Sequence, residues 1–124
     1  MANEISLTPK ITLLNGVVNV IAGQNLVRAD QNGTGYASES KRVTTSEAVS
    51  IIALMTTPGI GIISNDSAED SGDDNLIVKG GVERFLLLKP GEQFSIRFDP
   101  AQAAYAVEAS GGVGCDYSCT IFED

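Results

Sequence analysis

The sequence predicts an all-β protein, a single-domain antiparallel β-sandwich with an extended N-terminal arm or hairpin. Turn signals recur about every 8–12 residues, and the short apolar segments between them are rich in Val, Ile, Leu and Phe. The chain has 124 residues, a common size for one domain, and 43% of them are hydrophobic, which is enough to fill a core. We expect residues 1–22 to form the arm and hairpin of this domain, and residues 23–124 to form its sandwich body.

The arm contains the clearest hairpin signal, over residues 10–21. Its apolar residues flank Asn15-Gly16, a pair that accepts the positive φ angles of a two-residue type I′ turn. Apolar residues also recur at odd positions along the arm, which gives this segment one apolar edge. The residues on that edge, which we name as candidate contacts with a larger assembly or a neighbouring subunit, are Ile5, Leu7, Ile11 and Leu13.

The middle of the chain alternates polar and apolar segments. Residues 36–43 are polar, and we interpret them as an exposed edge strand or an extended connection. Residues 46–56 are apolar but begin with Ser46, a good helix N-cap. We interpret them as a strand, with a helix as the alternative, because β-branched residues are frequent and Pro58-Gly59 ends the segment early. Residues 60–64 form the next expected strand.

The second half predicts further strands around two loops. Residues 82–88 and 94–98 are expected to form a hairpin through Lys89-Pro90-Gly91-Glu92, because Pro at i+1 and Gly at i+2 suit a type II turn. Residues 103–109 alternate apolar and polar side chains, as a half-buried strand does. The last strand alternates in the same way, and its expected buried residues are Val113, Cys115, Tyr117, Cys119 and Ile121.

The composition argues against catalysis. The chain has no histidine, which removes the usual general base, the usual activator of Ser and Cys nucleophiles and the commonest zinc ligand. A carboxylate pair for glycoside hydrolysis is the enzymatic alternative, but sugar clefts are rich in aromatic residues, and the chain has three Tyr, four Phe and no Trp. We therefore expect no enzymatic activity and no cofactor.

The charge is acidic and unevenly distributed. The net charge of −8 repels phosphate backbones and anionic lipids, so we expect neither nucleic acid nor a membrane as a partner. Residues 1–64 contain four acidic and four basic residues, whereas residues 65–124 contain twelve acidic and four basic residues. No apolar run approaches the ~20 residues that span a bilayer, and the chain start lacks a basic signal region, so we expect a soluble product made in the cytoplasm.

The densest polar cluster lies in the loop from Asp66 to Asp74, which also contains Glu69, Asp70 and Asp73. Carboxylates can bind calcium, but their spacing does not match an EF-hand loop. We interpret the cluster as a solvated surface loop, with a calcium site as the alternative.

Two cysteines lie four residues apart in the last expected strand. Their side chains would point to the same face about 13 Å apart, which is beyond disulfide reach. A metal site would need two more Cys or His ligands, which the chain lacks. We interpret Cys115 and Cys119 as small buried thiols.

Seven sequence elements follow one another along the chain: Ile11-Thr12-Leu13-Leu14-Asn15-Gly16, Gly35-Tyr36, Thr45-Ser46-Glu47-Ala48, Thr57-Pro58-Gly59, Asn65-Asp66, Phe85-Leu86-Leu87-Leu88-Lys89-Pro90-Gly91-Glu92 and Glu123-Asp124. Their shared order resembles that of the small capsid decoration, or cement, proteins of tailed bacteriophages. The resemblance covers most of the chain.

The resemblance implies a jelly-roll-like sandwich without enzymatic activity. Such proteins bind the outer surface of the phage head and clamp neighbouring subunits of the major capsid protein, often as dimers or trimers. The expected location is accordingly the capsid surface of the virion, and the expected assembly a homodimer or homotrimer. A phage neck or tail component is the alternative within this class, and a carbohydrate-binding β-module is the alternative from another class.

Overall fold

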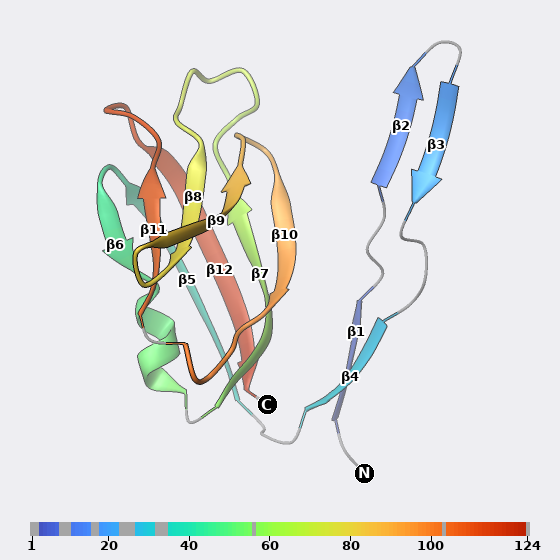
Figure 1. Ribbon diagram of the computed structural model, residues 1–124, viewed down its shortest axis with the longest axis vertical. Coiled ribbons are helices and arrows are strands. Elements are labelled where there is room, and N and C mark those ends of the chain that lie inside the picture. The colour runs from blue at the N-terminus through green and yellow to red at the C-terminus, as the bar shows by residue number, and fades with distance from the viewer. Residues whose placement is uncertain are drawn as a thin grey trace.

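The computed structural model describes residues 3–7, 11–15, 18–22, 27–31, 35–55, 57–102 and 104–123, the first four of these segments by their backbone only. The strands of the arm are β1 (Asn3–Leu7), β2 (Ile11–Asn15), β3 (Val18–Ala22) and β4 (Val27–Gln31). The strands of the body are β5 (Tyr36–Val43), β6 (Ser46–Ala48), β7 (Pro58–Asn65), β8 (Leu76–Gly80), β9 (Glu83–Leu88), β10 (Gln93–Arg97), β11 (Tyr105–Ala109) and β12 (Cys115–Glu123). A short 3₁₀ helix, η1 (Ser50–Leu54), joins β6 to β7 (Figure 1).

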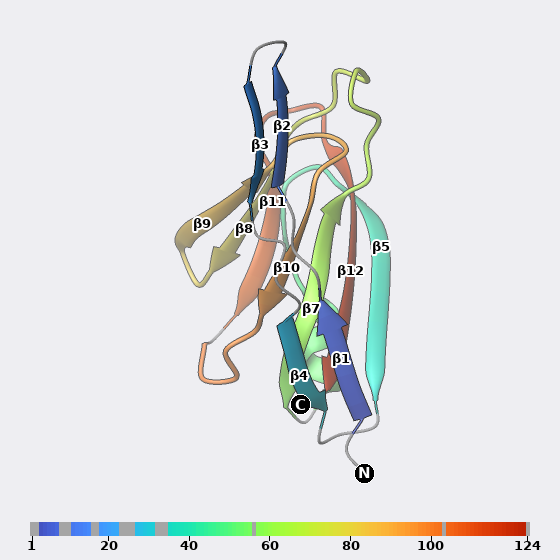
Figure 2. The same ribbon diagram turned by 90° about the vertical axis from the view of Figure 1, so that its right-hand side faces the viewer.

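The body is a sandwich of two antiparallel four-stranded sheets, which confirms the predicted fold class. The front sheet has the order β6-β11-β8-β9, and the back sheet has the order β10-β7-β12-β5. Figure 2 shows the two layers from the side, with β9, β8 and β11 in one layer and β7, β12 and β5 in the other. The polar strand β5 lies at the edge of the back sheet, as the sequence predicted for residues 36–43.

The pairing of the body strands is nested. β5 pairs with β12, β6 with β11, β7 with β10, and β8 with β9, so each partner lies progressively closer along the chain. Two further pairings, β7 with β12 and β8 with β11, complete the sheets. This is the order that one long antiparallel hairpin adopts when it is rolled into two layers.

The core lies between the two sheets and follows the alternation expected of strands. Along β12, every second side chain is buried, and these are the cysteines together with Tyr117 and Ile121. Val113, which we expected to join them, lies before the strand and is 58% exposed. Opposite β12, the front sheet contributes residues that are completely buried, among them Leu76, Val78 and Val107.

The predicted strand over residues 46–56 is correct only as far as Ala48. The N–H of Val49 bonds to the carbonyl of Tyr105, and the N–H of Ile52 then bonds back to the carbonyl of Val49, which starts a 3₁₀ turn. The helix crosses from the front sheet to the back sheet at one end of the sandwich and buries Ile51 there. The need to cover this end overrides the strand preference of β-branched residues.

The predicted hairpin over residues 82–98 is wrong in its pairing. The turn itself forms as expected, because the N–H of Glu92 bonds to the carbonyl of Lys89 and Gly91 has a φ of +87°. However, β9 pairs with β8 in the front sheet and β10 pairs with β7 in the back sheet. The turn therefore crosses between layers and places both edge strands on one flank of the sandwich.

The arm forms two small ladders of its own. β1 pairs with β4, and β2 pairs with β3, which confirms the predicted hairpin. In this hairpin Asn15 pairs with Val18, so the two connecting residues are 16 and 17, one position later than the expected Asn15-Gly16 turn. The geometry of that connection lies outside the described residues. Since β4 pairs with β1, it belongs with the arm, and the expected boundary after residue 22 stays a prediction.

Candidate interaction surfaces

The arm lies beside the body on the side of β10, as Figure 1 shows and Figure 2 confirms by placing it in front. None of the sheet pairings among the described residues joins it to the body. Of the four predicted contact residues, Ile5 and Leu7 lie in β1, whereas Ile11 and Leu13 lie in β2. The structure therefore places them on one arm but in two separate ladders.

The hairpin β2–β3 is unusual in its composition. Residues 11–22 contain no Asp, Glu, Lys or Arg, although the whole chain has a net charge of −8. An isolated two-stranded hairpin is marginally stable in water and normally needs another surface to pack against. The arm is thus a neutral segment that is suited to contact with a second molecule.

The acidic loop is anchored at its base by Arg42. One guanidinium nitrogen of Arg42 donates to Asp73 Oδ2 at 2.7 Å and the other to Asp73 Oδ1 at 3.1 Å, a bidentate contact. The same guanidinium also donates to the carbonyl of Val113 and to Asp116. The hydrogen bonds from Arg42 and Ser67 lower the pKa of Asp73 below its ordinary value.

A second anchor joins this loop to the turn before β12. Asp74 Oδ2 accepts the backbone N–H groups of Val113 at 3.0 Å and Gly114 at 2.6 Å. The buried Asn65 amide donates to the carbonyls of Leu88 and Asp74, which holds the start of the loop. The interpretation of a solvated loop is therefore correct for its exposed tip and wrong for its base. The described residues contain no group of three or more Asp, Glu, Cys or His side chains that could hold a metal ion.

The outer side of the back sheet carries an uncharged hydroxyl face that the sequence analysis did not identify. In the strand register, Ser118 lies between Ser40 and Ser64, and Thr120 lies between Ser38 and Ile62. The hydroxyls of Ser38 and Thr120 are 2.8 Å apart. We define the hydroxyl face by these residues and their neighbour on β10: Ser38, Ser40, Ser64, Ser95, Ser118 and Thr120.

Apolar side chains are exposed on the side of the sandwich where β9 and β10 form the sheet edges. Three of them are half exposed: Phe85 at 49%, Leu87 at 50% and Phe94 at 51%. We call these three residues the β9–β10 flank. Phe94 is paired in register with Ile63, which is fully buried, so it belongs to the inner side of the back sheet. The sandwich is therefore incompletely covered along this flank.

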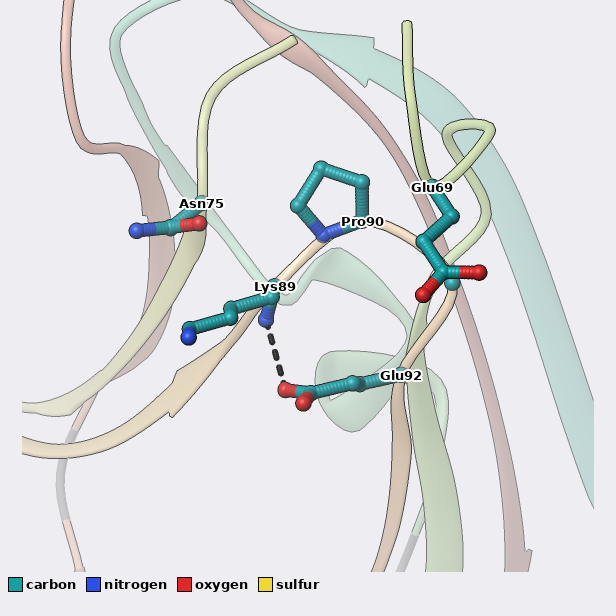
Figure 3. Close-up of a pocket in the computed structure, with 6 residues that line it drawn as sticks. Glu69, Asn75, Lys89, Pro90 and Glu92 are labelled. Carbon is teal, nitrogen blue, oxygen red and sulfur yellow. Dashed lines mark hydrogen bonds between the residues drawn. The ribbon is translucent and has the colours of Figure 1, made fainter. Parts of the chain in front are cut away.

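A shallow pocket of about 440 Å³ lies at the turn between β9 and β10 (Figure 3). Its lining consists of Glu69, Asn75, Lys89, Pro90, Gly91 and Glu92. The Glu92 carboxylate accepts the backbone N–H of Lys89 at 2.8 Å, and the Lys89 side chain points away from it. Small-molecule sites of this size are mostly apolar with a few convergent polar groups. This lining is polar and lacks an aromatic side chain, so it points to no ligand class.

A largely buried polar cluster is centred on Glu39, whose side chain is 12% exposed. The Tyr117 hydroxyl donates to Glu39 Oε1 at 2.7 Å, and the Ser50 hydroxyl donates to Oε2 at 2.6 Å. Both carboxylate oxygens thus have hydrogen-bond partners, as a buried carboxylate requires.

The two cysteine thiols are free and buried, as the sequence predicted. Burial raises the pKa of Cys115 to about 11 and that of Cys119 to about 12. The Glu39 cluster and the two thiols therefore have a structural role in the interior.

Comparison with protein-family models, with curated proteins and with solved structures gave no match. No helix among the described residues has the length and the apolar character needed to cross a membrane.

Proposed function

We propose that this protein is a non-enzymatic structural component of a phage virion, a decoration or cement protein that binds the outer surface of the capsid. The observation that carries the proposal is the neutral N-terminal arm, which pairs with neither sheet of the body in the described residues. A segment that pairs with neither sheet of its own body is free in its strand edges to contact a second molecule. The arm, with Ile5, Leu7, Ile11 and Leu13, is the proposed contact with the shell or with a neighbouring subunit.

Two further features support this proposal. The nested pairing of the eight body strands is the order expected of a jelly roll, the fold that the sequence resemblance implies. The hydroxyl face adds an uncharged surface that is cheaper to bury against another protein than a charged one, because unpaired charges are costly to desolvate. We propose in addition that the protein self-associates as a dimer or trimer, since open sheet edges invite pairing.

The direct test is sedimentation of purified protein with empty capsids of its phage. We expect the protein to co-sediment at a fixed ratio to the major capsid protein and to saturate at that ratio. Isolated tails with necks serve as the comparison sample. Saturable binding to tails and none to capsids would overturn the capsid assignment in favour of a neck or tail component, and binding to neither would overturn both.

A further inference from the structure

The β9–β10 flank and the hairpin β2–β3 have matching properties. The chain segments that carry the flank, residues 85–88 and 94–96, contain no charged residue, and neither do residues 11–22 of the hairpin. β10 is five residues long, as are β2 and β3. Both β9 and β10 are edge strands, so each has a side that pairs with no described strand. An edge strand next to exposed apolar side chains is a template for the addition of a further strand.

We propose that the hairpin β2–β3 of one copy docks on the β9–β10 flank of a second copy. The inference rests on the self-association proposed above and identifies the two surfaces that make it. Phe94 faces inward on the back sheet yet stays half exposed, and Phe85, in the bulge of β9, lies edge-on to Tyr105 with ring centroids 6.3 Å apart. A docked hairpin would cover both rings and close the sandwich at this flank.

The charge distribution is compatible with a second copy as the occupant only through the neutral part of the chain. Two molecules with a net charge of −8 repel each other, and the acidic excess lies in residues 65–124. The neutral arm offers a contact through the half of the chain that carries no net charge. Within one copy, the arm already lies on the side of β10 but pairs only with itself in the described strands, which leaves its remaining edges for another molecule.

The available area favours a reciprocal exchange. A standard interface buries ~800 Å² on each partner, whereas two half-exposed Phe rings supply only ~200 Å² of aromatic surface. One hairpin on one flank is therefore a weak contact. If each copy gives its hairpin and receives the other, the buried area doubles and the dimer closes with two-fold symmetry.

Complementation between two full-length variants tests this arrangement. The arm variant carries Leu13→Glu and Val20→Lys, which are opposite each other in the hairpin register, so the new charges attract and the hairpin pairing is kept. The flank variant carries Leu87→Lys and Phe94→Glu. The control carries Tyr36→Lys and Val113→Glu, because Tyr36 is 70% exposed on β5, at the far edge of the back sheet, and Val113 is 58% exposed before β12. All three variants keep the net charge of the wild type.

The self-association constant is measured by sedimentation velocity, and mixtures of mass-tagged variants are measured by native mass spectrometry. We expect the wild type and the control to associate at micromolar concentration, and the arm and flank variants alone to associate roughly tenfold or more weakly. A mixture of the arm variant with the flank variant should form a one-to-one heterodimer that is weaker than the wild-type dimer and stronger than either variant alone, because it restores one of the two contacts.

Three results would overturn the inference. A flank variant that associates like the wild type would leave self-association standing and remove the flank from it. A mixture that associates no more strongly than either variant alone would show that the arm and the flank do not meet. A monomeric wild type would remove both this contact and the proposed dimer or trimer. Thermal unfolding of each variant checks its fold, and if Phe94→Glu unfolds the protein, Phe85→Glu with Leu87→Lys replaces the flank variant.

Discussion

At the residue scale, Tyr117 stabilises the largely buried carboxylate of Glu39 through a hydrogen bond. Its side chain is fully buried, and its hydroxyl occupies one oxygen of Glu39, whose side chain is only 12% exposed. Removing a partner from a largely buried charge costs more than the hydrogen bond contributes on average, because the charge keeps its desolvation penalty.

We predict that Tyr117→Phe lowers the free energy of unfolding by about 1.5–3 kcal/mol, the usual range for a hydrogen bond to a charged group. Urea unfolding followed by circular dichroism measures the change. The matched control is Tyr36→Phe, since Tyr36 is 70% exposed, and its effect should stay within about 0.5 kcal/mol. Equal effects of the two substitutions would contradict a structural role for the Glu39 contact.

The two thiols make a second prediction at this scale. Because burial raises the pKa of Cys115 from 9.0 to about 11 and that of Cys119 to about 12, their thiolate fractions at pH 8 fall by about 100-fold and about 1,000-fold. We predict slow alkylation by iodoacetamide in the native protein and rapid alkylation of both residues in denaturant, read by mass spectrometry. Fast native labelling, or a disulfide mapped to residues 115–119, would refute the buried-thiol assignment.

At the element scale, the contact between β7 and β12 depends on a glycine. A Cβ at Gly61 would meet the backbone carbonyl of Thr120 and lie 3.1 Å from the Cα of Ile121. Backbone atoms in the middle of a sheet cannot move aside as a flexible side chain can. The absence of a side chain at this position therefore allows β7 and β12 to pair closely here.

We predict that Gly61→Ala destabilises the protein by about 1–3 kcal/mol, the usual cost of overpacking. Gly112→Ala is the matched control, because a Cβ there meets no atom within 4 Å, and its effect should be below about 0.5 kcal/mol. The two variants are compared by urea unfolding. A neutral Gly61→Ala variant would show that β7 and β12 separate easily.

The anchored base of the acidic loop predicts a pH dependence. The pKa of Asp73 lies below its ordinary value of 3.8 in the folded protein, so its contribution to stability is present above that pH and is lost as the pH falls through the folded pKa. We predict that Asp73→Asn lowers the Tm at pH 7 and that the difference from wild type disappears in acid. Asp70→Asn, on the exposed tip, should leave the Tm unchanged at both pH values. A difference for Asp73→Asn that persists at low pH would contradict this assignment.

The sequence predicted the elements better than their partners. Alternation identified the buried side of β12 because a strand side chain has only two directions, in or out. The turn at residues 89–92 was predicted correctly, but turn chemistry specifies local φ angles and does not determine whether the following strand stays in the same sheet. The β9–β10 flank and the Arg42 contact with Asp73 depend on residues distant in the chain, and no local pattern predicts them.

At the scale of the whole molecule, the surface has an acidic part, the loop from Asp66 to Asp74, and a neutral part, the N-terminal arm. The exposed tip of the acidic loop projects from one end of the body, whereas the neutral arm lies along the β10 side. Burying unpaired carboxylates against another protein is costly, so the acidic end is suited to solvent. The neutral arm is the part best suited to contact with a shell.

This division predicts how the molecule is oriented on the capsid. Deleting residues 2–9 removes β1 and the contact residues Ile5 and Leu7, and we expect it to weaken capsid binding while thermal unfolding still shows a folded sandwich. Neutralising the loop tip with Asp66→Asn, Glu69→Gln and Asp70→Asn should change binding little, because those exposed carboxylates are expected to face solvent. Binding is measured by co-sedimentation with empty capsids across a range of protein concentrations. Full binding by the truncated protein, together with lost binding by the loop variant, would mean that the acidic end faces the shell and the arm faces outward.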